Sequence, residues 1–220
     1  MGYPEVMQPI RNGVQPVAGL LLAAGGGRRL GGRPKALLPH RGRPLVEHAL
    51  RVLREGGCGP LHVVLGASAD EVRERADLTG CTPVDNPRWA DGMGTSLRAG
   101  LASLGAGRSA PGKDGPADGP GAALVLLVDQ PGIGARAVAR VAAAYGGSAG
   151  ALASATYGGG RGHPVLLGAD HWAGVAAGAV GDRGARDYLR AHRAEITLVE
   201  CGDVAEPYDI DTPEDLARLE

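Results

Sequence analysis

Phenylalanine is absent from the 220 residues, and aromatic side chains make up 3% of them. Proteins that bind single-stranded nucleic acid stack the bases on aromatic side chains, so this class of partner has no platform here. The formal net charge is −1, which gives no overall attraction to nucleic acid or to an anionic membrane surface. We therefore expect no nucleic-acid and no membrane partner, and any positive charge that binds an anion must be gathered locally.

Cysteine is also scarce. Cys58, Cys81 and Cys201 lie far apart without Cys-x-x-Cys spacing, which argues against a disulfide framework and a zinc site. No stretch approaches the roughly 20 apolar residues of a membrane span, and residues 1–15 lack the basic start and apolar run of a secretion signal. These absences predict a cytoplasmic protein with buried thiols.

Lysine is the rarest charged residue. Only Lys35 and Lys113 occur among 23 basic residues, and arginine fills the other cationic positions. A lysine offers a compact ammonium group on a flexible stem, whereas arginine offers a planar fork. Lys35 therefore marks a position where a compact charge is useful.

A glycine-rich loop with four cations follows the first apolar run. Residues 17–23 predict a buried strand, and Gly25, Gly26 and Gly27 after it let backbone N–H groups approach an anion without interference from Cβ atoms. This combination is typical of a site for a nucleoside triphosphate. The cations are Arg28, Arg29, Arg33 and Lys35.

Two common phosphate-binding motifs do not fit this loop. A dinucleotide fingerprint that starts at Gly25 needs glycine at its sixth position, where Leu30 stands. A P-loop spanning Gly27 and Gly32 needs lysine next, where Arg33 stands. The loop is therefore neither of these motifs.

Hydrophobic periodicity predicts one α/β domain over residues 17–220, after a flexible leader at 1–16. Alternating strands and helices indicate a Rossmann-like three-layer α/β/α sandwich with a mostly parallel mixed sheet, whose ligands bind at the carboxyl ends of the strands. Residues 105–121 are rich in glycine and proline and are predicted to form a surface insertion. We expect strands at 17–23, 61–66, 81–84, 122–128, 151–156, 164–167 and 196–199, and helices at 45–53, after Ser68, after a Thr95 or Ser96 cap, at 135–145, at 185–192 and from Pro213.

Several ordered motifs resemble those of the MobA/MocA-like nucleotidyltransferases. They include Leu22-Ala-Ala-Gly25, Pro34-Lys-Ala-Leu-Leu-Pro39, Asp129-Gln-Pro131, Gly162-His-Pro-Val165 and Asp209-Ile-Asp211, and the resemblance covers about Val17 to Glu220. Ala24 is the residue that makes the first motif similar to molybdenum cofactor cytidylyltransferases, since guanylyltransferases have glycine there. The resemblance implies Mg²⁺-dependent transfer of CMP from CTP to the terminal phosphate of molybdopterin. It further implies transient contact with molybdoenzymes or their chaperones.

The nucleotide side of the site follows from the same resemblance. Arg29 and Lys35 would hold the β- and γ-phosphates, Gly94 and Ser96 would lie near the phosphates, and Arg28 and Arg33 would face solvent. The wall of this pocket would come from residues 86–96, for which a turn followed by a helix cap is the other interpretation. The base and ribose would be read by the backbone of Leu22, Ala23, Ala24, Gly25 and Gly26.

Two aspartates are the candidate metal ligands. Asp129 ends the apolar run 124–128, where a carboxylate points into the ligand crevice, and Mg²⁺ prefers such hard oxygen ligands. By resemblance Asp129 binds the metal and Asp211 supplies the second carboxylate. Without that resemblance, Asp129 could equally begin a turn and Asp211 could simply start a helix.

The acceptor is expected to meet His163, Asp182 and Arg186. The Arg186 guanidinium could bind a terminal phosphate with its planar fork. The competing interpretations are a structural histidine and a surface ion pair between Asp182 and Arg186. The remaining histidines show no metal-ligand spacing and are given no role.

Other functions remain open at this point. A transferase of the same fold could use GTP or another phosphorylated acceptor. An NAD(P)H-dependent oxidoreductase similar to nicotine blue reductase could use the glycine-rich turn, although the carboxylates argue against it. A binding module that delivers the cofactor would not need Arg29, Lys35 or Asp129.

Overall fold

The computed structural model describes residues 14–108 and 118–219. Most of the predicted leader and the centre of the predicted insertion lie outside these ranges. The first two residues of the predicted insertion, Gly105 and Ala106, are the last residues of helix α3 (Met93–Ala106). None of the helices in 14–108 or 118–219 is long and apolar enough to cross a membrane.

Seven strands form one mixed sheet with the order β5-β4-β1-β6-β8-β7-β9. Neighbours pair in parallel except at β8, which runs antiparallel to both β6 and β7. The predicted mostly parallel mixed sheet in a single α/β domain is thereby confirmed. The strands are β1 (Val17–Leu22), β4 (Leu61–Leu65), β5 (Cys81–Asp85), β6 (Ala122–Leu127), β7 (Leu152–Tyr157), β8 (Gly160–Gly168) and β9 (Ile196–Glu200).

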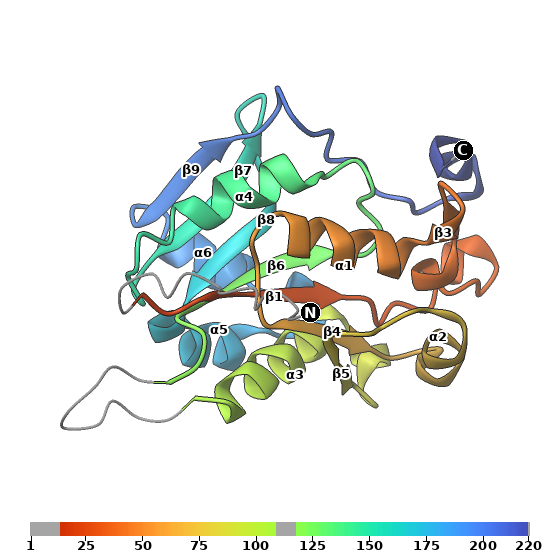
Figure 1. The fold of residues 1–220 in the computed structure, drawn as a ribbon, viewed down its shortest axis with the longest axis horizontal. Helices are drawn as coiled ribbons and strands as arrows, with labels where there is room; N and C mark the ends of the chain where they lie inside the picture. Colours follow the sequence, from red (N-terminus) through yellow and green to blue (C-terminus); the bar gives the residue numbers. More distant parts are fainter. Residues whose placement is uncertain (1–13, 109–117, 220) are drawn as a thin grey trace, which may run out of the picture.

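Helices cover both faces of the sheet (Figure 1). Helices α1 (Leu45–Glu55) and α4 (Ala135–Ala143) pack on one face, with Val72 of α2 (Ala69–Arg75) joining the same cluster. Helices α3, α5 (Trp172–Gly178) and α6 (Arg186–Ala191) cover the other face. Successive strand residues point to opposite faces, so Leu21 joins the first cluster while Leu20 joins the second.

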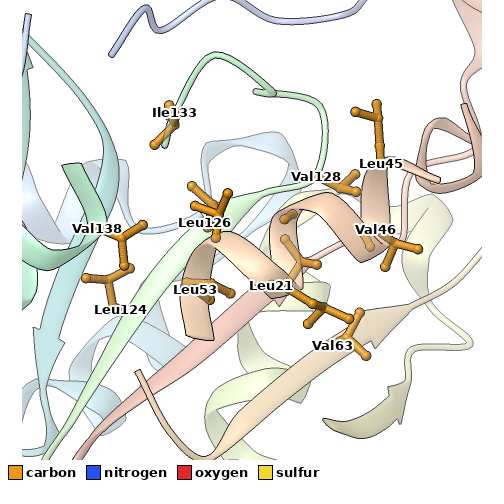
Figure 2. Close-up of a cluster of buried hydrophobic side chains, with 14 of the residues drawn as sticks. Leu21, Leu45, Val46, Leu53, Val63, Leu124, Leu126, Val128, Ile133 and Val138 are labelled. Carbon is orange, nitrogen blue, oxygen red and sulfur yellow. The ribbon is translucent and has the colours of Figure 1, made fainter. Parts of the chain in front are cut away.

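Leucine, valine and alanine build this core in place of phenylalanine. Figure 2 shows Leu21, Val63, Leu124 and Leu126 of the strands among Leu53 and other residues of the first cluster. Burying one such side chain stabilises the fold by roughly 1.5–3 kcal/mol. On the other face, Gly100 allows α3 to approach β1 closely, because a Cβ there would lie 2.5 Å from the Leu20 side chain.

Four local predictions are wrong or incomplete. Helix α3 begins at Met93 after Gly92, so Thr95 and Ser96 lie inside the helix and do not cap it. Strand β8 begins four residues before the predicted Pro164, α5 was not predicted, and the last helix is a 3₁₀ segment. The short elements are β2 (Pro39–His40), β3 (Arg43–Pro44), η1 (Arg28–Leu30), η2 (Lys35–Leu37), η3 (Trp89–Asp91), η4 (Ala169–His171), η5 (Gly181–Arg183) and η6 (Pro213–Leu219).

Candidate active site

Charged residues distant in sequence meet beside the carboxyl ends of β1 and β6. Lys35, at the start of η2, donates hydrogen bonds from Nζ to Asp129 Oδ2 at 2.7 Å and to Asp211 Oδ1 at 2.5 Å. Arg29 Nη1 lies 3.3 Å from Asp211 Oδ2. The structure therefore brings together four of the predicted site residues in one cluster.

Backbone hydrogen bonds fix the two carboxylates. Asp129 directly follows Val128, whose N–H donates to the Leu22 carbonyl at 3.1 Å and continues the pairing of β6 with β1. Its own carbonyl accepts a 2.9 Å bond from the N–H of Ile210. Asp211 N–H in turn donates to Asp215 Oδ2 at 3.0 Å. The segment that carries Asp211 is thus tied both to β6 and to the start of η6.

The cluster is close to neutral. Two aspartates face one lysine and one arginine, with side-chain exposures of 14% for Lys35 and 74% for Arg29. Burial by itself would lower the pKa of Lys35, but the charges and hydrogen bonds of Asp129 and Asp211 outweigh it and raise the pKa. Lys35 is therefore protonated at neutral pH. Its ion pairs are shielded from water, whereas the exposed Arg29 pair is worth about 0–1 kcal/mol.

The glycine-rich loop has one position that only glycine can fill. Gly27 has φ +57°, and a Cβ there would lie 1.8 Å from the Arg33 carbonyl oxygen. The Gly27 carbonyl accepts from Leu30 N–H at 2.8 Å and Gly32 N–H at 3.1 Å, which closes the loop on itself. Gly25, by contrast, has no heavy atom within 4 Å of a Cβ position, so its backbone is open to a ligand.

A cavity of about 660 Å³ lies over this loop and the charged cluster. Its size is that of a small-molecule site. Ala23 is not among its lining residues and belongs to the core cluster on the α1 side, and Gly94 is buried against the Ala179 carbonyl. The predicted residues that do line it are Leu22, Ala24, Gly25, Gly26, Arg29, Lys35, Ser96, Asp129, Asp182, Arg186 and Asp211.

Asn86 organises the wall of this cavity. Its Nδ2 donates to Thr95 Oγ1 at 2.8 Å and to Ser96 Oγ at 2.9 Å, which fixes the first turn of α3 from inside. Trp89 lies against Gly26 on the other side of the wall, and Arg28 stands over its ring at 6.0 Å. Arg28 and Arg33 are both exposed, although Arg28 also lines the cavity.

A second cavity of about 840 Å³ adjoins the first. Leu22, Met93, Leu127 and Arg186 line both. Apolar residues from β1, β6, β8 and α3 line much of it, and Asp182, predicted to act with His163, lies instead in the smaller cavity. Its charged and polar lining consists of Gln130, Ser154, Tyr157, Arg161, His163, Arg183, Arg186, Arg190 and Asp209.

The arginines around the larger cavity differ in their partners. Arg183 and Arg190 both form ion pairs with Asp187, at 2.8 Å and 3.2 Å. Within residues 14–108 and 118–219, neither Arg161 nor Arg186 forms an ion pair. Two guanidinium groups are therefore available to an anionic ligand.

His163 and Asp209 also face the larger cavity. Burial lowers the pKa of His163 to about 4, so its imidazole is neutral at physiological pH. Asp209 Oδ1 accepts a 2.7 Å hydrogen bond from Gln130 Nε2. Burial raises the pKa of Asp209, and the charges of Asp129 and Asp211 add to this effect.

Sequence reasoning missed part of this lining. Arg161 stands on β8 near the turn from β7, and nothing in its local sequence separates it from the other arginines. Gln130 was passed over although it lies inside the quoted Asp-Gln-Pro motif. The histidines without an assigned role lie elsewhere, such as His171, which is hydrogen-bonded to Tyr188 Oη and the Gly150 carbonyl, both at 2.9 Å.

The site suits a metal that needs few protein ligands. The described residues contain no group of three or more His, Cys, Asp and Glu side chains gathered as a metal site. Asp129 and Asp211 share a single ammonium group, so their hard oxygens are close enough to share one cation. This arrangement fits Mg²⁺, which usually keeps several waters and one or two carboxylates.

Known proteins similar to this chain include an oxidoreductase, a nucleotidyltransferase and solved structures of the same fold. The chain is 40% identical over 210 residues to nicotine blue oxidoreductase of Paenarthrobacter nicotinovorans, covering 92% of this chain and 96% of that protein. It is 38% identical over 96 residues to the molybdenum cofactor guanylyltransferase of Pseudomonas fluorescens, covering 43% of this chain and 46% of that protein. The solved structure of Rv0371c from Mycobacterium tuberculosis in complex with manganese superimposes with a TM-score of 0.71 and 27% identity, over 93% of this chain and 97% of the other.

The family model of the MobA-like NTP transferase domain matches residues 19–196. This span contains most of β1, the glycine-rich loop, and β6 with Asp129 after it, and it leaves out the segment that carries Asp211. We conclude that the chain belongs to the family of MobA-like NTP transferases.

Proposed function

We propose that the protein transfers CMP from CTP to the terminal phosphate of molybdopterin, with Mg²⁺ as cofactor. The observation that carries the proposal is the convergence of Lys35, Asp129 and Asp211 beside an open glycine loop. Nucleotidyl transfer brings two anions together, so a site that offers cations and metal-binding carboxylates is suited to it.

The chain's own residues would position the reactants. The triphosphate lies along Gly25 and Gly26, with Arg29 and Lys35 on the β- and γ-phosphates, and the acceptor enters from the larger cavity past Arg186. An oxygen of the acceptor phosphate bonds to the α-phosphorus of CTP while the bond to the bridging oxygen breaks and pyrophosphate leaves. Mg²⁺ held by Asp129 and Asp211 would neutralise the charge that develops on the phosphates.

Three observations each support one part of this proposal. Ala24 lines the nucleotide cavity at the position where the resemblance separates cytidylyl from guanylyl transfer. A relative named molybdenum cofactor guanylyltransferase matches 43% of the chain, which supports the acceptor but not the choice of CTP. A structural neighbour solved with manganese supports a divalent metal as cofactor. The proposal includes a cytoplasmic location, where the free cysteines would remain reduced, and contact with molybdoenzymes or their chaperones.

An oxidoreductase is the second candidate. The relative named nicotine blue oxidoreductase matches 92% of the chain at 40% identity, which is a longer match than that of the guanylyltransferase. In this alternative the larger cavity would hold the substrate to be reduced, and the glycine loop would hold NAD(P)H. The paired carboxylates around Lys35 would then have no role in the reaction.

Thermal unfolding with different ligands separates these functions. The protein is heated with CTP, GTP, ATP, UTP or NADPH, each with and without Mg²⁺. A ligand that binds the folded state but not the unfolded state raises Tm. We therefore expect the largest rise in Tm with CTP, and only when Mg²⁺ is present. A preference for GTP would redirect the proposal to guanylyl transfer, and a metal-independent response to NADPH alone would favour the oxidoreductase.

A further inference from the structure

The ammonium group of Lys35 lies between the two carboxylates of the proposed metal site. Lys35 Nζ is 2.7 Å from Asp129 Oδ2 and 2.5 Å from Asp211 Oδ1, so it uses one oxygen of each. We propose that Lys35 keeps these carboxylates from a divalent metal until a triphosphate draws its ammonium group away, so that metal and triphosphate bind cooperatively. This inference rests on the proposed function, which makes Asp129 and Asp211 the metal ligands.

The charge balance of the cluster favours this coupling. With Lys35 and Arg29 in place, the two aspartates are already neutralised. A divalent ion entering the free protein would stand beside two cations, and like charges at such short range in a partly buried site repel strongly. A triphosphate brings enough negative charge to reverse this balance, because it attracts both cations and leaves the carboxylates without partners.

The geometry permits the exchange. Lys35 lines the same cavity as Gly25, Gly26 and Gly27, so a triphosphate on the loop lies beside its side chain. Its four-carbon stem lets the ammonium group turn from the carboxylates to a phosphate without moving the backbone. Arg29 is 74% exposed on the side chain and is held by one 3.3 Å contact, so it too can turn toward a phosphate.

The competing interpretation is a static ion pair. In that case Lys35 would only stabilise the loop, and a metal would use carboxylate oxygens that the ammonium leaves free. Removing Lys35 would then not strengthen metal binding. The two interpretations therefore differ in the affinity of the nucleotide-free protein for a metal.

Mn²⁺ binding to the full chain without nucleotide tests this difference. The concentration of free Mn²⁺ is measured by electron paramagnetic resonance at pH 8 for the wild type, Lys35→Met, Lys35→Arg and Arg33→Met. We expect Lys35→Met to bind Mn²⁺ at least about tenfold more tightly than the wild type, which corresponds to about 1.4 kcal/mol. Lys35→Arg keeps a cation near the carboxylates and should remain weak.

Arg33→Met is the matched control, because it removes one exposed positive charge from the same loop. An equal gain in Arg33→Met and Lys35→Met would overturn the inference, since net charge would then explain it. Unchanged or weaker binding in Lys35→Met would also overturn it. Lys35→Gln replaces Lys35→Met if circular dichroism shows that the latter is unfolded.

The double variant Lys35→Met/Asp129→Asn separates this inference from the proposed function. We expect it to lose the gained Mn²⁺ affinity. If it keeps the gain, Asp129 is not a metal ligand and the proposed metal site fails together with the inference. If Lys35→Met binds Mn²⁺ no more tightly than the wild type, while the single variant Asp129→Asn binds it more weakly, only the inference fails.

Discussion

The two adjoining cavities use charge in opposite ways. In the smaller one, Lys35 and Arg29 form ion pairs with carboxylates that lie 94, 176 and 182 positions away in the sequence. In the larger one, Arg161 and Arg186 have no ion pair within the described part of the chain, and much of the lining is apolar. In our proposals, the neutral cluster exchanges its ion pairs for contacts with a metal and a triphosphate, whereas Arg161 and Arg186 bind a ligand that carries negative charge.

Removal of the Asp129 carboxylate from the smaller cavity should have the largest effect on turnover. We expect Asp129→Asn to reduce turnover by about 10²- to 10³-fold, as the loss of one electrostatic group does in other enzymes. The variant should stay folded, because Asn preserves the size of the side chain. Turnover with CTP and Mg²⁺ and circular dichroism give the two measurements.

Asp85→Asn is the control for this change. Asp85 is the last residue of parallel strand β5, much as Asp129 lies just beyond the end of β6, but Asp85 is exposed and pairs with Arg73 at 2.6 Å. Its loss should leave turnover unchanged and reduce stability by about 0–1 kcal/mol. Equal loss of turnover in both variants would mean that strand-end charge in general, and not the Lys35 cluster, supports the reaction.

A Cβ at Gly27 should disturb the loop of the smaller cavity without touching the larger one. Left-handed backbone costs about 1–2 kcal/mol for a residue other than glycine, and the 1.8 Å approach to the Arg33 carbonyl forces the loop to move as well. Gly27→Ala should therefore lower the free energy of unfolding by more than about 2 kcal/mol in urea titrations and weaken triphosphate binding.

Gly31→Ala provides the comparison, because Gly31 has φ +69° and no heavy atom within 4 Å of its Cβ position. Its cost should be limited to about 1–2 kcal/mol of backbone strain, without the further cost of moving the loop. If the two variants lose the same stability, the contact with Arg33 does not shape the loop.

Arginine truncations should separate the two ligands. Arg186 lines both cavities and Arg161 only the larger one. Losing a hydrogen bond to a charged group costs about 1.5–3 kcal/mol, so either Arg→Ala change should raise the acceptor KM by roughly 10- to 100-fold. Arg186→Ala should also raise the KM for nucleotide, and Arg161→Ala should not. An effect of Arg161→Ala on nucleotide alone would reverse the assignment of the cavities.

The pH dependence of acceptor binding should show the smallest effect. Burial lowers the pKa of His163 to about 4, so the imidazole is neutral above about pH 5 and gains a proton only below that. Its charge therefore does not change between pH 5.5 and 8. His163→Asn should alter the acceptor KM by a few fold with the same pH profile as the wild type. A step in the wild-type profile near pH 6.5 that disappears in His163→Asn would show that the imidazole titrates there.

The sheet was the most predictable part of the fold. Strands β1 and β6 are continuous apolar runs and β4 is interrupted by one residue, His62, as expected for strands buried on both faces. The first half of β8 was missed because Gly160, Arg161 and Gly162 are exposed or half-exposed and carry no apolar pattern. Helix α5 was missed for a related reason, since five of its seven residues are alanine or glycine.

The candidate site was predictable as residue types but not as an arrangement. The resemblance pointed to Lys35, Asp129 and Asp211, and the structure places them within hydrogen-bonding distance. Periodicity could not reveal that distance, because no local pattern links positions 94 or 176 residues apart. In the larger cavity, by contrast, Arg183 and Arg190 find a local partner, since both form ion pairs with Asp187 at i,i+4 and i,i+3 spacing.

The late position of Asp211 in the chain has a consequence for biosynthesis. Chains fold as they leave the ribosome, starting from the N-terminal side. Lys35 and Asp129 are made long before Asp211, so the growing chain can hold the ammonium with only one of its two carboxylates. The hydrogen bond from Ile210 N–H to the Asp129 carbonyl then brings Asp211 into place. The cluster is therefore completed only after Asp211 has been made, and a chain that ends before Asp211 cannot form it.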